Sequence, residues 1–286
     1  MLNIRPATAA DLEAMRELGV AAFGAARGTI GYLLEERHGI LGGRTWADRY
    51  RAGVRWEDSF VAELEGRLAG FASYVYREQW RLGILKNNAV APSYQGRGLS
   101  TALCRHVVTH LKALGASQLT VHTLCHIPAA MRVYEKVGFG NPVYGFVLSA
   151  GAAALRRPQS SALVRPAAAS DERTVEQLCR RLGVPYDPKG TVFLAERDGS
   201  LAAFVRLACD RADRTAFVAQ LCIDRDRDLG AEAVGGLIAF ACADLAAQGT
   251  LVFSGYAAEK DALSRRAYEA AGFTVLCRDV TYTMQA

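Results

Sequence analysis

The most informative stretch of the chain, residues 90–101, reads Val-Ala-Pro-Ser-Tyr-Gln-Gly-Arg-Gly-Leu-Ser-Thr. Val90 ends an apolar run typical of a strand, and Leu99 begins a series of leucines and valines at helical spacing. Gly96 and Gly98 therefore lie in a tight strand-to-helix turn, where they allow close backbone approach. The N–H groups of such a turn converge on one place, and the dipole of the helix adds positive potential there.

The side chains of this turn also favour an anionic ligand. Arg97 adds a positive charge, and the hydroxyls of Ser100 and Thr101 add hydrogen-bond donors. The stretch predicts a pyrophosphate site, with an ordinary glycine-rich turn as the alternative. A dinucleotide-binding fingerprint fits poorly, because no acidic residue stands between Glu78 and Glu135 to bind a ribose, and the Gly-Lys-Ser/Thr of a Walker A loop is absent.

Three segments of the first half recur, in the same order, in the second half. They are residues 4–7 with 164–167 (Ile-Arg-Pro-Ala and Val-Arg-Pro-Ala), 60–71 with 193–204, and 134–139 with 268–273 (Tyr-Glu-Lys-Val-Gly-Phe and Tyr-Glu-Ala-Ala-Gly-Phe). This order predicts an internal duplication of roughly 140 residues. We therefore expect two domains, residues 1–150 and 163–286, joined by a linker at 151–162 that is rich in small residues.

Apolar periodicity predicts the same order of elements in each copy. In the first copy a helix follows Thr8, where Thr8 and Asp11 form a capping-box pattern, and a turn at Gly66–Arg67 joins two strands. The expected strands cover residues 60–65, 68–76, 85–91, 119–123 and 143–148, and further helices cover 99–114 and 128–136. The predicted fold class is α/β (α+β), with a mixed, mostly antiparallel sheet flanked by helices in each copy.

Composition excludes several classes of protein. The chain has 286 residues, 51% apolar and 22% charged, which is typical of a globular protein. A net charge of +5 is too small for a nucleic-acid-binding protein without a basic cluster. No apolar run reaches the ~18 residues of a membrane span, and no secretory signal is present. Seven cysteines without a C-x-x-C pair suggest reduced thiols, no metal site and a cytoplasmic location.

Two motifs of the first copy resemble those of the GNAT (N-acetyltransferase) superfamily. Residues 95–100, Gln-Gly-Arg-Gly-Leu-Ser, match its Gln/Arg-x-x-Gly-x-Gly/Ala loop except that serine replaces the last small residue. Residues 134–139 match its later Tyr-Glu-Lys-x-Gly-Phe signature, although Ile127 stands where the family usually has asparagine before Ala130. The resemblance covers Ile4 to about Ser149 and, more weakly, Val164 to Met284.

The resemblance implies a tandem acetyltransferase that takes acetyl-CoA, or another acyl-CoA, as donor and needs no metal. The pyrophosphate would bind residues 95–100, and the pantetheine would run beside residues 89–91. Tyr134 would act as general acid toward the CoA sulfur, and a backbone N–H near Val90 would polarise the carbonyl, although packing alone could also retain the tyrosine. The expected donor-binding residues are Ala89, Val90, Ala91, Gln95, Gly96, Arg97, Gly98, Leu99, Ser100, Thr101, Met131 and Tyr134.

The general base is less clearly marked. Many relatives carry a glutamate on the strand before the loop, but residues 85–90 contain no carboxylate. His122 lies on the next strand, and imidazole changes protonation state between pH 5 and 8. Glu78, acting through water, is the other candidate. His126, at the end of the strand of His122, could instead bind donor or substrate.

The second copy lacks the features expected of the loop. Residues 228–233 read Asp-Leu-Gly-Ala-Glu-Ala, so that Asp228 and Glu232 place negative charge where a pyrophosphate would bind. From Asp171 to Phe193 the second copy spans only 22 residues, against 49 between the matching Asp11 and Phe60. We therefore interpret the second copy as a scaffold or lid.

The sequence leaves the acceptor open. We expect residues 23–56 to bind it, since this segment carries aromatic residues and, together with the two residues that follow it, acids that could hold a cationic amine. These acids are Glu35, Glu36, Asp48, Glu57 and Asp58. The alternative is inward packing of the aromatic side chains. We predict acetyl transfer to the amine of a small molecule, by a monomer or homodimer. The alternatives are a non-catalytic acyl-CoA sensor and an acetyltransferase acting on a protein or peptide amine.

Overall fold

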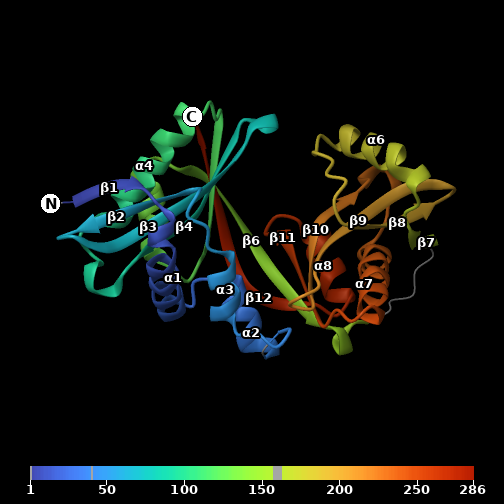
Figure 1. Ribbon diagram of the computed structural model, residues 1–286. Coiled ribbons are helices and arrows are strands. Elements are labelled where there is room, and N and C mark those ends of the chain that lie inside the picture. The colour runs from blue at the N-terminus through green and yellow to red at the C-terminus, as the bar shows by residue number, and fades with distance from the viewer. Residues whose placement is uncertain (1, 40, 157–162) are drawn as a thin grey trace. The chain divides into compact units, whose positions relative to one another are not determined.

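The computed structural model describes residues 2–39, 41–156 and 163–286. Contacts between residues divide the chain into two compact units, each a twisted sheet with helices packed against it (Figure 1). Unit 1 comprises Met1–Ile40, Arg44–Tyr144 and Arg278–Ala286, and unit 2 comprises Leu41–Gly43 and Gly145–Cys277.

Unit 1 is built from six strands and five helices within the described residues. The strands are β1 (Leu2–Pro6), β2 (Ser59–Leu64), β3 (Arg67–Arg77), β4 (Leu82–Val90), β5 (Gln118–Leu124) and most of β12 (Thr274–Gln285). The helices are α1 (Leu12–Ala26), α2 (Ile30–His38), α3 (Trp46–Gly53), α4 (Leu99–Ala113) and α5 (Pro128–Val137). The strand order is β1-β2-β3-β4-β5-β12, and only the β4–β5 pair is parallel.

Unit 2 repeats this plan with fewer helices before its second strand. Its strands are most of β6 (Gly140–Gly151), β7 (Leu163–Pro166), β8 (Thr191–Arg197), β9 (Ser200–Asp210), β10 (Thr215–Ile223) and β11 (Val252–Ala258). Its helices are α6 (Glu172–Leu182), α7 (Ala231–Ala247) and α8 (Ala262–Ala270). The order is β7-β8-β9-β10-β11-β6, and again only one pair, β10–β11, is parallel. The mixed, mostly antiparallel sheets predicted for both copies are confirmed.

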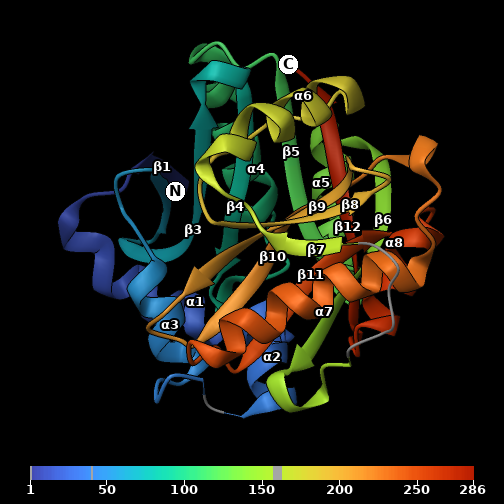
Figure 2. The ribbon, with the colours of Figure 1, turned by 90° about the vertical axis from the view of Figure 1, so that its right-hand side faces the viewer.

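The last strands of the two copies are exchanged. The sequence predicts that residues 143–148 complete the first copy, but Gly145–Gly151 of β6 pair with β11 in unit 2. The strand beside β5 is instead β12, which pairs along Asp279–Gln285 and is visible in red next to β5 (Figure 2). Leu148 is fully buried in the core of unit 2, as Val280 is in that of unit 1.

The units therefore differ from the linear division at 150 and 163. Gly145–Ala150 belongs with unit 2 and Arg278–Ala286 with unit 1. Part of the expected linker is ordered structure, because Ala152–Ala154 form a 3-10 turn and the N–H of Arg156 donates to Ala271 at 3.0 Å. The rest of that linker, residues 157–162, lies outside the described residues.

One arginine ties the same three elements together in each unit. In unit 1 the guanidinium of Arg5 donates to both carboxylate oxygens of Asp11, each at 2.8 Å, and to Glu63 at 2.6 Å. In unit 2 Arg165 makes the matching bonds to Asp171 at 2.6 and 2.9 Å and to Glu196 at 2.6 Å. The repeated Arg-Pro-Ala motif thus joins the first strand, the first helix and the second strand.

The predicted helix start and hairpin are confirmed in detail. The Thr8–Asp11 capping box forms, with the Thr8 N–H and hydroxyl both 2.8 Å from Asp11. Glu65 and Gly66 turn between β2 and β3 with φ of 56° and 74°, as a two-residue hairpin with right-handed strand twist requires. The turn is thus centred one residue before the expected Gly66–Arg67.

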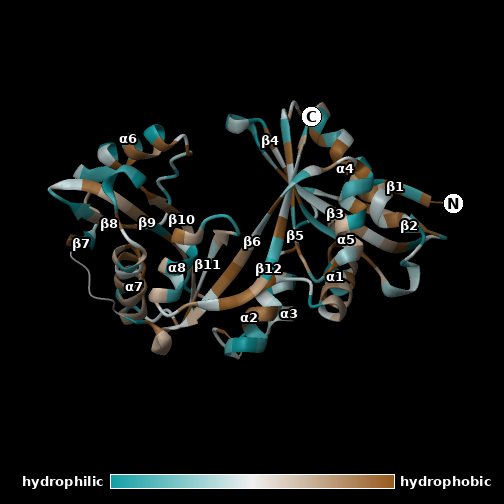
Figure 3. Cartoon of the chain, turned by 180° about the vertical axis from the view of Figure 1, so that it is seen from behind, coloured by the Kyte–Doolittle hydropathy of each residue, from teal (hydrophilic) through white to brown (hydrophobic). Residues whose placement is uncertain are grey.

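Each sheet has an apolar core on both faces. In unit 1, α4 and α5 cover one face around Leu103, Val121 and Tyr282, and α1 covers the other around Met15 and Phe71. In unit 2 the main core includes α7, which is apolar over most of its surface (Figure 3). No helix in the described ranges combines the length and apolar character that a membrane span needs. The seven cysteines, all within the described residues, form no disulfide with one another.

Candidate active site

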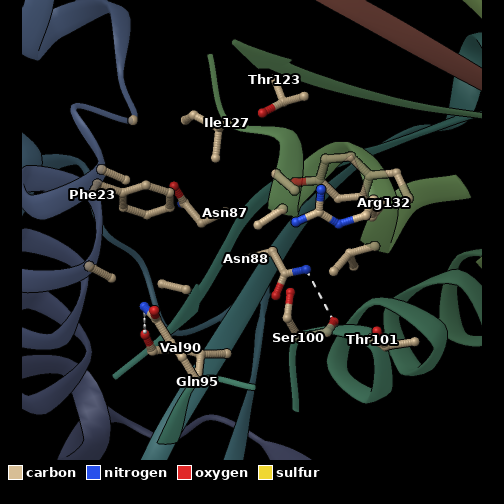
Figure 4. A pocket seen from close by; sticks show the side chains of 18 of the residues that line it. Phe23, Asn87, Asn88, Val90, Gln95, Ser100, Thr101, Thr123, Ile127 and Arg132 are labelled. Carbon is tan, nitrogen blue, oxygen red and sulfur yellow. Dashed lines mark hydrogen bonds between the residues drawn. The ribbon is translucent and has the colours of Figure 1, made fainter. Parts of the chain in front are cut away.

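A cavity opens in unit 1 where two parallel strands separate. The β4–β5 ladder runs only from the Leu82–Gln118 pair to the Leu85–Val121 pair. Beyond it, one extra residue in β4 shifts the register with β3 between the Ala72–Asn88 and Tyr74–Leu85 pairs, which is a β-bulge. The ends of β4 and β5 that do not pair with each other form walls of a cavity of about 670 Å³, seen in Figure 4.

The predicted phosphate loop forms one end of this cavity. After β4 a 3-10 turn, Pro92–Tyr94, leads to Gly96 and Gly98, whose φ angles are 78° and 79°. A Cβ at either position would meet nothing within 4 Å. Left-handed backbone, and not close approach, is therefore what requires glycine at both positions.

The start of α4 leaves backbone donors free to bind a ligand. Its first i→i−4 bond runs from the Ala102 N–H to the Gly98 carbonyl at 3.0 Å, so the three N–H groups before Ala102 have no acceptor within the helix. The Gln95 side chain fixes the loop by donating its amide to the Val90 carbonyl at 3.2 Å. The loop is thus held in an anion-binding shape without a ligand.

Two asparagines of the bulge have roles that the sequence did not indicate. Asn87 donates to the Ser73 hydroxyl at 2.8 Å and, in Figure 4, points toward Phe23 of α1. Asn88 donates to the Ser100 carbonyl at 3.2 Å, which links β4 to α4. Its Oδ1 is buried without a hydrogen-bond partner in the described part of the chain, so an unused acceptor lies beside the loop.

Most of the expected site residues line the cavity. These are Ala89, Val90, Gln95, Gly96, Gly98, Leu99, Ser100, Thr101, His122 and Tyr134. Ala91 and Met131 lie next to lining residues but are not among them. Arg97 is exposed, and its guanidinium carbon lies 5.4 Å from the centre of the Tyr94 ring.

The position of Glu78 does not support its expected role as base. It lies in an exposed 3-10 turn, Glu78–Trp80, at the far end of the β3–β4 hairpin. Leu82, at the start of β4, is separated from Lys86, the first cavity residue of that strand, by roughly 13 Å of strand. The sequence named Glu78 as a candidate base acting through water, but the hairpin carries it away from the cavity.

Tyr134 reaches the cavity from the buried face of α5. Its side chain is 6% exposed and packs against Phe139 and Tyr282, with ring centroids 6.2 and 6.5 Å away. Burial raises the pKa of its phenol well above the ordinary value of 10. The hydroxyl therefore keeps its proton at neutral pH, as a proton donor must.

His122 is paired with a carboxylate from the far end of the sequence. Its Nε2 lies 2.6 Å from Oδ2 of Asp279 on β12. Asp279 is 2% exposed, whereas the side chain of His122 is 42% exposed and lines the cavity. Nothing in the local sequence could identify this partner, because 157 residues separate the two.

The end of the cavity away from the loop is apolar and closed on one side. Phe23, Ile30 and Ile127 line it. The connection between α1 and α2 contacts the one between β5 and α5, because His126 Nε2 lies 3.2 Å from the Arg27 carbonyl oxygen. His126 itself is exposed.

The acids expected to hold a cationic acceptor lie elsewhere. None of the five is among the cavity-lining residues. Glu35 accepts a hydrogen bond from the backbone N–H of Trp46, and Asp48 caps α3 by accepting one from the Thr45 hydroxyl at 2.7 Å. The aromatic side chains of this segment pack on one another, as the alternative predicted, with the Trp46 and Tyr50 ring centroids 5.6 Å apart.

The charged side chains that line the cavity are all positive. They are Lys86, Arg132 and Lys136, and Arg132 projects into the cavity from α5 (Figure 4). Neither Asp nor Glu is among the lining residues. Such walls favour a phosphate-bearing ligand. Within the described residues, no group of three or more His, Cys, Asp or Glu is placed to hold a metal ion.

Unit 2 closes the position that corresponds to the phosphate loop. Leu229 stands in this turn and is 5% exposed, within the main core. Asp224 is buried and bonded to Arg181, and it lies 3.5 Å from Arg227. Gly230, the N-cap of α7, has a φ of −68°, which any residue can adopt. Asp224, Arg225 and Arg227 of this turn are thus paired with side chains of unit 2, Arg225 through Asp261 at 2.9 Å.

Comparisons with known proteins agree with the first-copy motifs. Residues 29–139 match the acetyltransferase (GNAT) family. The chain is 33% identical over 96 residues to the mycothiol acetyltransferase of Gordonia bronchialis, and 31% identical over 97 residues to the ribosomal protein bS18-alanine N-acetyltransferase of Escherichia coli K12. These alignments cover about a third of this chain, 31% of the first relative and 64% of the second.

Solved structures share the fold over the whole chain. A GCN5-related N-acetyltransferase from Sphaerobacter thermophilus has a TM-score of 0.73 at 15% identity, covering 99% of this chain and 95% of that one. A tandem GNAT protein from the clavulanic acid biosynthesis pathway has a TM-score of 0.67 at 15% identity, covering 100% and 98%. The loop and the later signature both lie in unit 1, within the residues that match the acetyltransferase (GNAT) family, and the solved structures share the fold of both units.

Proposed function

We propose that unit 1 is an N-acetyltransferase that moves an acetyl group from acetyl-CoA to the amine of a small molecule. One observation carries this proposal: a left-handed glycine loop and the free N–H groups of α4 face a cavity that begins where β4 and β5 separate. If the anionic group of a long ligand binds the loop, the rest of that ligand would thus extend between the two strands. Unit 2, whose turn is filled and internally paired, would serve as scaffold or lid.

The residues present fit the donor. The loop, Gln95 to Ser100, would hold the pyrophosphate, with the hydroxyl of Thr101 nearby. The edge of β4 at Ala89–Ala91 would bind the amide groups of the pantetheine, as an unpaired strand edge can. Arg132 and Lys136 add positive charge along the same walls. Arg97 would act through its charge, since its side chain lies outside the cavity.

Acetyl-CoA, when bound, supplies a thioester whose carbonyl carbon forms a bond to the acceptor nitrogen as the carbon–sulfur bond breaks. A backbone N–H of β4 near Val90 would polarise the carbonyl oxygen. Tyr134, whose hydroxyl keeps its proton, would give that proton to the departing sulfur. His122 would take the proton that the nitrogen loses.

The shape of the acceptor end favours a small molecule. Phe23, Ile30 and Ile127 surround it, and the bond between His126 and the Arg27 carbonyl closes one side. A protein terminus would need an open groove at this point. The relatives include enzymes named for each kind of acceptor, mycothiol and the alanine of a ribosomal protein. Both kinds of acceptor are therefore included in the test below.

A non-catalytic acyl-CoA sensor is the second candidate. It is favoured by the absence of a carboxylate on β4, where many GNAT relatives carry their base. A sensor would bind acetyl-CoA and release no thiol with any amine. Turnover therefore separates the two functions, whereas binding does not.

The test is a calorimetric titration of acetyl-CoA into the full chain and into Arg97→Glu. We expect one site per chain, weakened at least tenfold by the charge reversal. The matched control is Arg225→Glu in the corresponding turn of unit 2, which should leave the affinity unchanged. Two sites, or a site lost only in Arg225→Glu, would mean that unit 2 binds the donor.

Catalysis is tested in the same preparation by thiol release from acetyl-CoA. The amine panel would include spermidine, glucosamine, several free amino acids and a short peptide with N-terminal alanine. Turnover with one of the small amines supports the proposed function. Binding without turnover would favour the sensor, and turnover with the peptide alone would favour a protein acceptor.

A further inference from the structure

We propose that Asp279 is the positioning residue of this active site: it fixes the ring and the tautomer of His122, so that the other ring nitrogen can accept a proton in the cavity. This inference rests on the proposed acetyl transfer and specifies which groups act as its base. It assigns a function to the last strand of the chain, which the motifs of the first copy do not contain.

The two side chains are diagonal neighbours on adjacent strands. Thr281 lies directly opposite His122 in the β5–β12 ladder, and Asp279 lies two residues away, opposite Leu124. Residues separated by two along a strand share a face of the sheet, so the carboxylate and the imidazole meet on the same face. Their separation of 2.6 Å is that of a strong, charge-assisted hydrogen bond.

This face is the one that the acceptor end occupies. Val121 and Val280, which alternate with His122 and Asp279, point into the core beneath α4 and α5. His122 therefore projects from the opposite face of the sheet, on which α1 packs. A base on that side would meet an acceptor that enters between Phe23 and Ile127, with the donor loop at the other end of the cavity.

The hydrogen bond decides which nitrogen can act. An ionised carboxylate only accepts hydrogen bonds, so the nitrogen facing it, Nε2, must carry the hydrogen. In neutral imidazole this leaves the lone pair on Nδ1. Because Asp279 is 2% exposed while His122 is 42% exposed, the buried partner holds the ring and the exposed ring faces the cavity.

The pairing also stabilises the product of the proton transfer. The acceptor nitrogen forms its bond to the acetyl carbon and gives a proton to Nδ1 as the carbon–sulfur bond breaks, and Tyr134 gives a proton to the sulfur. The imidazolium then returns its proton to the tyrosine through solvent, so the products are an acetylated amine and a free thiol. While it is charged, the ring lies against the buried carboxylate, which lowers the free energy of that state.

Unit 2 provides an internal comparison. Counting back from the tyrosine shared by both copies, Tyr134 and Tyr268, the position of His122 corresponds to Tyr256. Gly145 lies opposite Ala258 as Asp279 lies opposite Leu124. A Cβ on Gly145 would be only 2.4 Å from the ring of Tyr256, so that ring fills the space in which the carboxylate stands in unit 1. The histidine–aspartate pair therefore occurs in unit 1, which has the glycine loop and the cavity. It is replaced in unit 2, where the corresponding turn is filled.

The test combines a direct reading of the ring with kinetics on the full chain. Protein labelled with ¹⁵N in histidine gives the tautomer of each ring from its nitrogen shifts, and a His122→Gln variant identifies the signals of His122. We expect wild-type His122 to carry its hydrogen on Nε2. In Asp279→Asn the amide can present its NH₂ to Nε2, which would move the hydrogen to Nδ1 and block the base.

Kinetics use acetyl-CoA and the fastest amine of the panel. Asp279→Asn and Asp279→Ala should lower kcat by about 100-fold or more while the KM for acetyl-CoA and its calorimetric affinity stay within about threefold. The control Thr283→Val changes the other diagonal neighbour of His122 on the same strand and face, which makes no hydrogen bond to the ring in the described part of the chain, and should leave kcat and the tautomer unchanged. Circular dichroism and thermal unfolding would show that each variant is folded.

Each outcome has a distinct meaning. A wild-type ring with its hydrogen on Nδ1, or an active Asp279→Asn with kcat within threefold of wild type, would overturn the role of Asp279. If the wild type binds acetyl-CoA but turns over no amine, the expected tautomer would show that the pair is structural, and the catalytic inference would fail together with the proposed function. Loss of kcat with an altered tautomer and retained donor affinity supports the proposal.

Discussion

Units 1 and 2 share the contacts that hold the fold and differ where unit 1 has its cavity. Arg5 and Arg165 make matching bonds to an aspartate and a glutamate. The loop glycines and the His122–Asp279 pair, in contrast, are replaced in unit 2 by the buried Leu229 and by Tyr256 over Gly145. The comparison separates residues that occur in both units and hold the fold from residues of unit 1 alone, to which we assign the proposed site.

Tyrosine is the residue for which this comparison matters most. Tyr134 and Tyr268 are both buried, and burial raises the pKa of each phenol above its ordinary value. A tyrosine at this position is therefore compatible with packing alone. Only the cavity beside Tyr134 gives it a possible reaction partner.

The largest effect should come from removing the exchanged strand. A chain that ends at Cys277 loses the fully buried Val280 and the nearly buried Tyr282 from the core of unit 1. Truncating two such side chains costs roughly 5 kcal/mol or more, which is comparable to the stability of a domain. Thermal unfolding and acetyl-CoA titration should show that unit 1 is lost.

The matched control for this truncation is deletion of Leu2–Pro6. It removes β1, an edge strand with no buried residue, and should lower the melting temperature much less. If the chain ending at Cys277 still binds acetyl-CoA, the strand that begins near Val143 must be able to pair with β5 in its place. The exchange of strands would then be optional.

Exchanging the two tyrosines for phenylalanine tests the comparison at the site. Tyr134→Phe should lower kcat by about 100-fold, because the proton donor for the departing sulfur is gone. Tyr268→Phe should leave kcat within twofold and cost only about 1 kcal/mol of stability through its lost hydrogen bond to the backbone of Tyr256. Equal losses of kcat would show that both residues act through packing.

Gly98→Ala should weaken acetyl-CoA binding by about tenfold, whereas Gly230→Ala, at the start of the corresponding helix of unit 2, should not. Gly98 has a φ of 79°, and a side chain in left-handed backbone costs roughly 1–2 kcal/mol, equivalent to about tenfold in affinity if the loop shifts to relieve it. Gly230 has a φ of −68° and tolerates alanine. The measurement is the acetyl-CoA dissociation constant of each variant. A stronger effect from Gly230→Ala would contradict the assignment of the donor site to unit 1.

The smallest effect on stability is expected from replacing the two matching arginines, and the two replacements should cost the same. Arg5→Met and Arg165→Met should each cost about 1 kcal/mol, because the ion-pair networks are partly exposed. The thermal unfolding of each variant at pH 7 checks this. Unequal costs would indicate that the copies no longer share this contact energetically.

Acid should remove the contribution of the same network. The guanidinium of Arg165 lowers the pKa of Asp171 from its ordinary 3.8 to about 2. A carboxyl whose pKa is lower in the folded state stabilises the fold fully above about pH 4, and this stabilisation is lost as the pH falls toward 2. The difference in stability between wild type and Arg165→Met should therefore shrink between pH 5 and pH 2.

Local sequence was sufficient to predict many of the elements and the loop, although α2 and α3 were not predicted. The capping box at Thr8, the hairpin near Gly66 and the left-handed turn before Leu99 depend on residues within a few positions of one another. The repeated Arg-Pro-Ala motif likewise indicated the internal duplication. Such features can be predicted from the sequence because short-range hydrogen bonds and φ preferences involve residues that are neighbours along the chain.

Pairings between distant strands were decided only by the tertiary structure. β6 and β12 both carry alternating apolar residues, so the pattern alone did not show that each completes the other copy's sheet. The same fact hid Asp279, which reaches His122 across 157 residues. The position of Glu78 depends instead on the length of the β3–β4 hairpin, whose pairing extends to Arg77 and Leu82 and carries the turn away from the cavity. Alternation sets which face a residue takes, but the choice of neighbouring strand depends on how whole cores pack, and that is fixed only when the chain is folded.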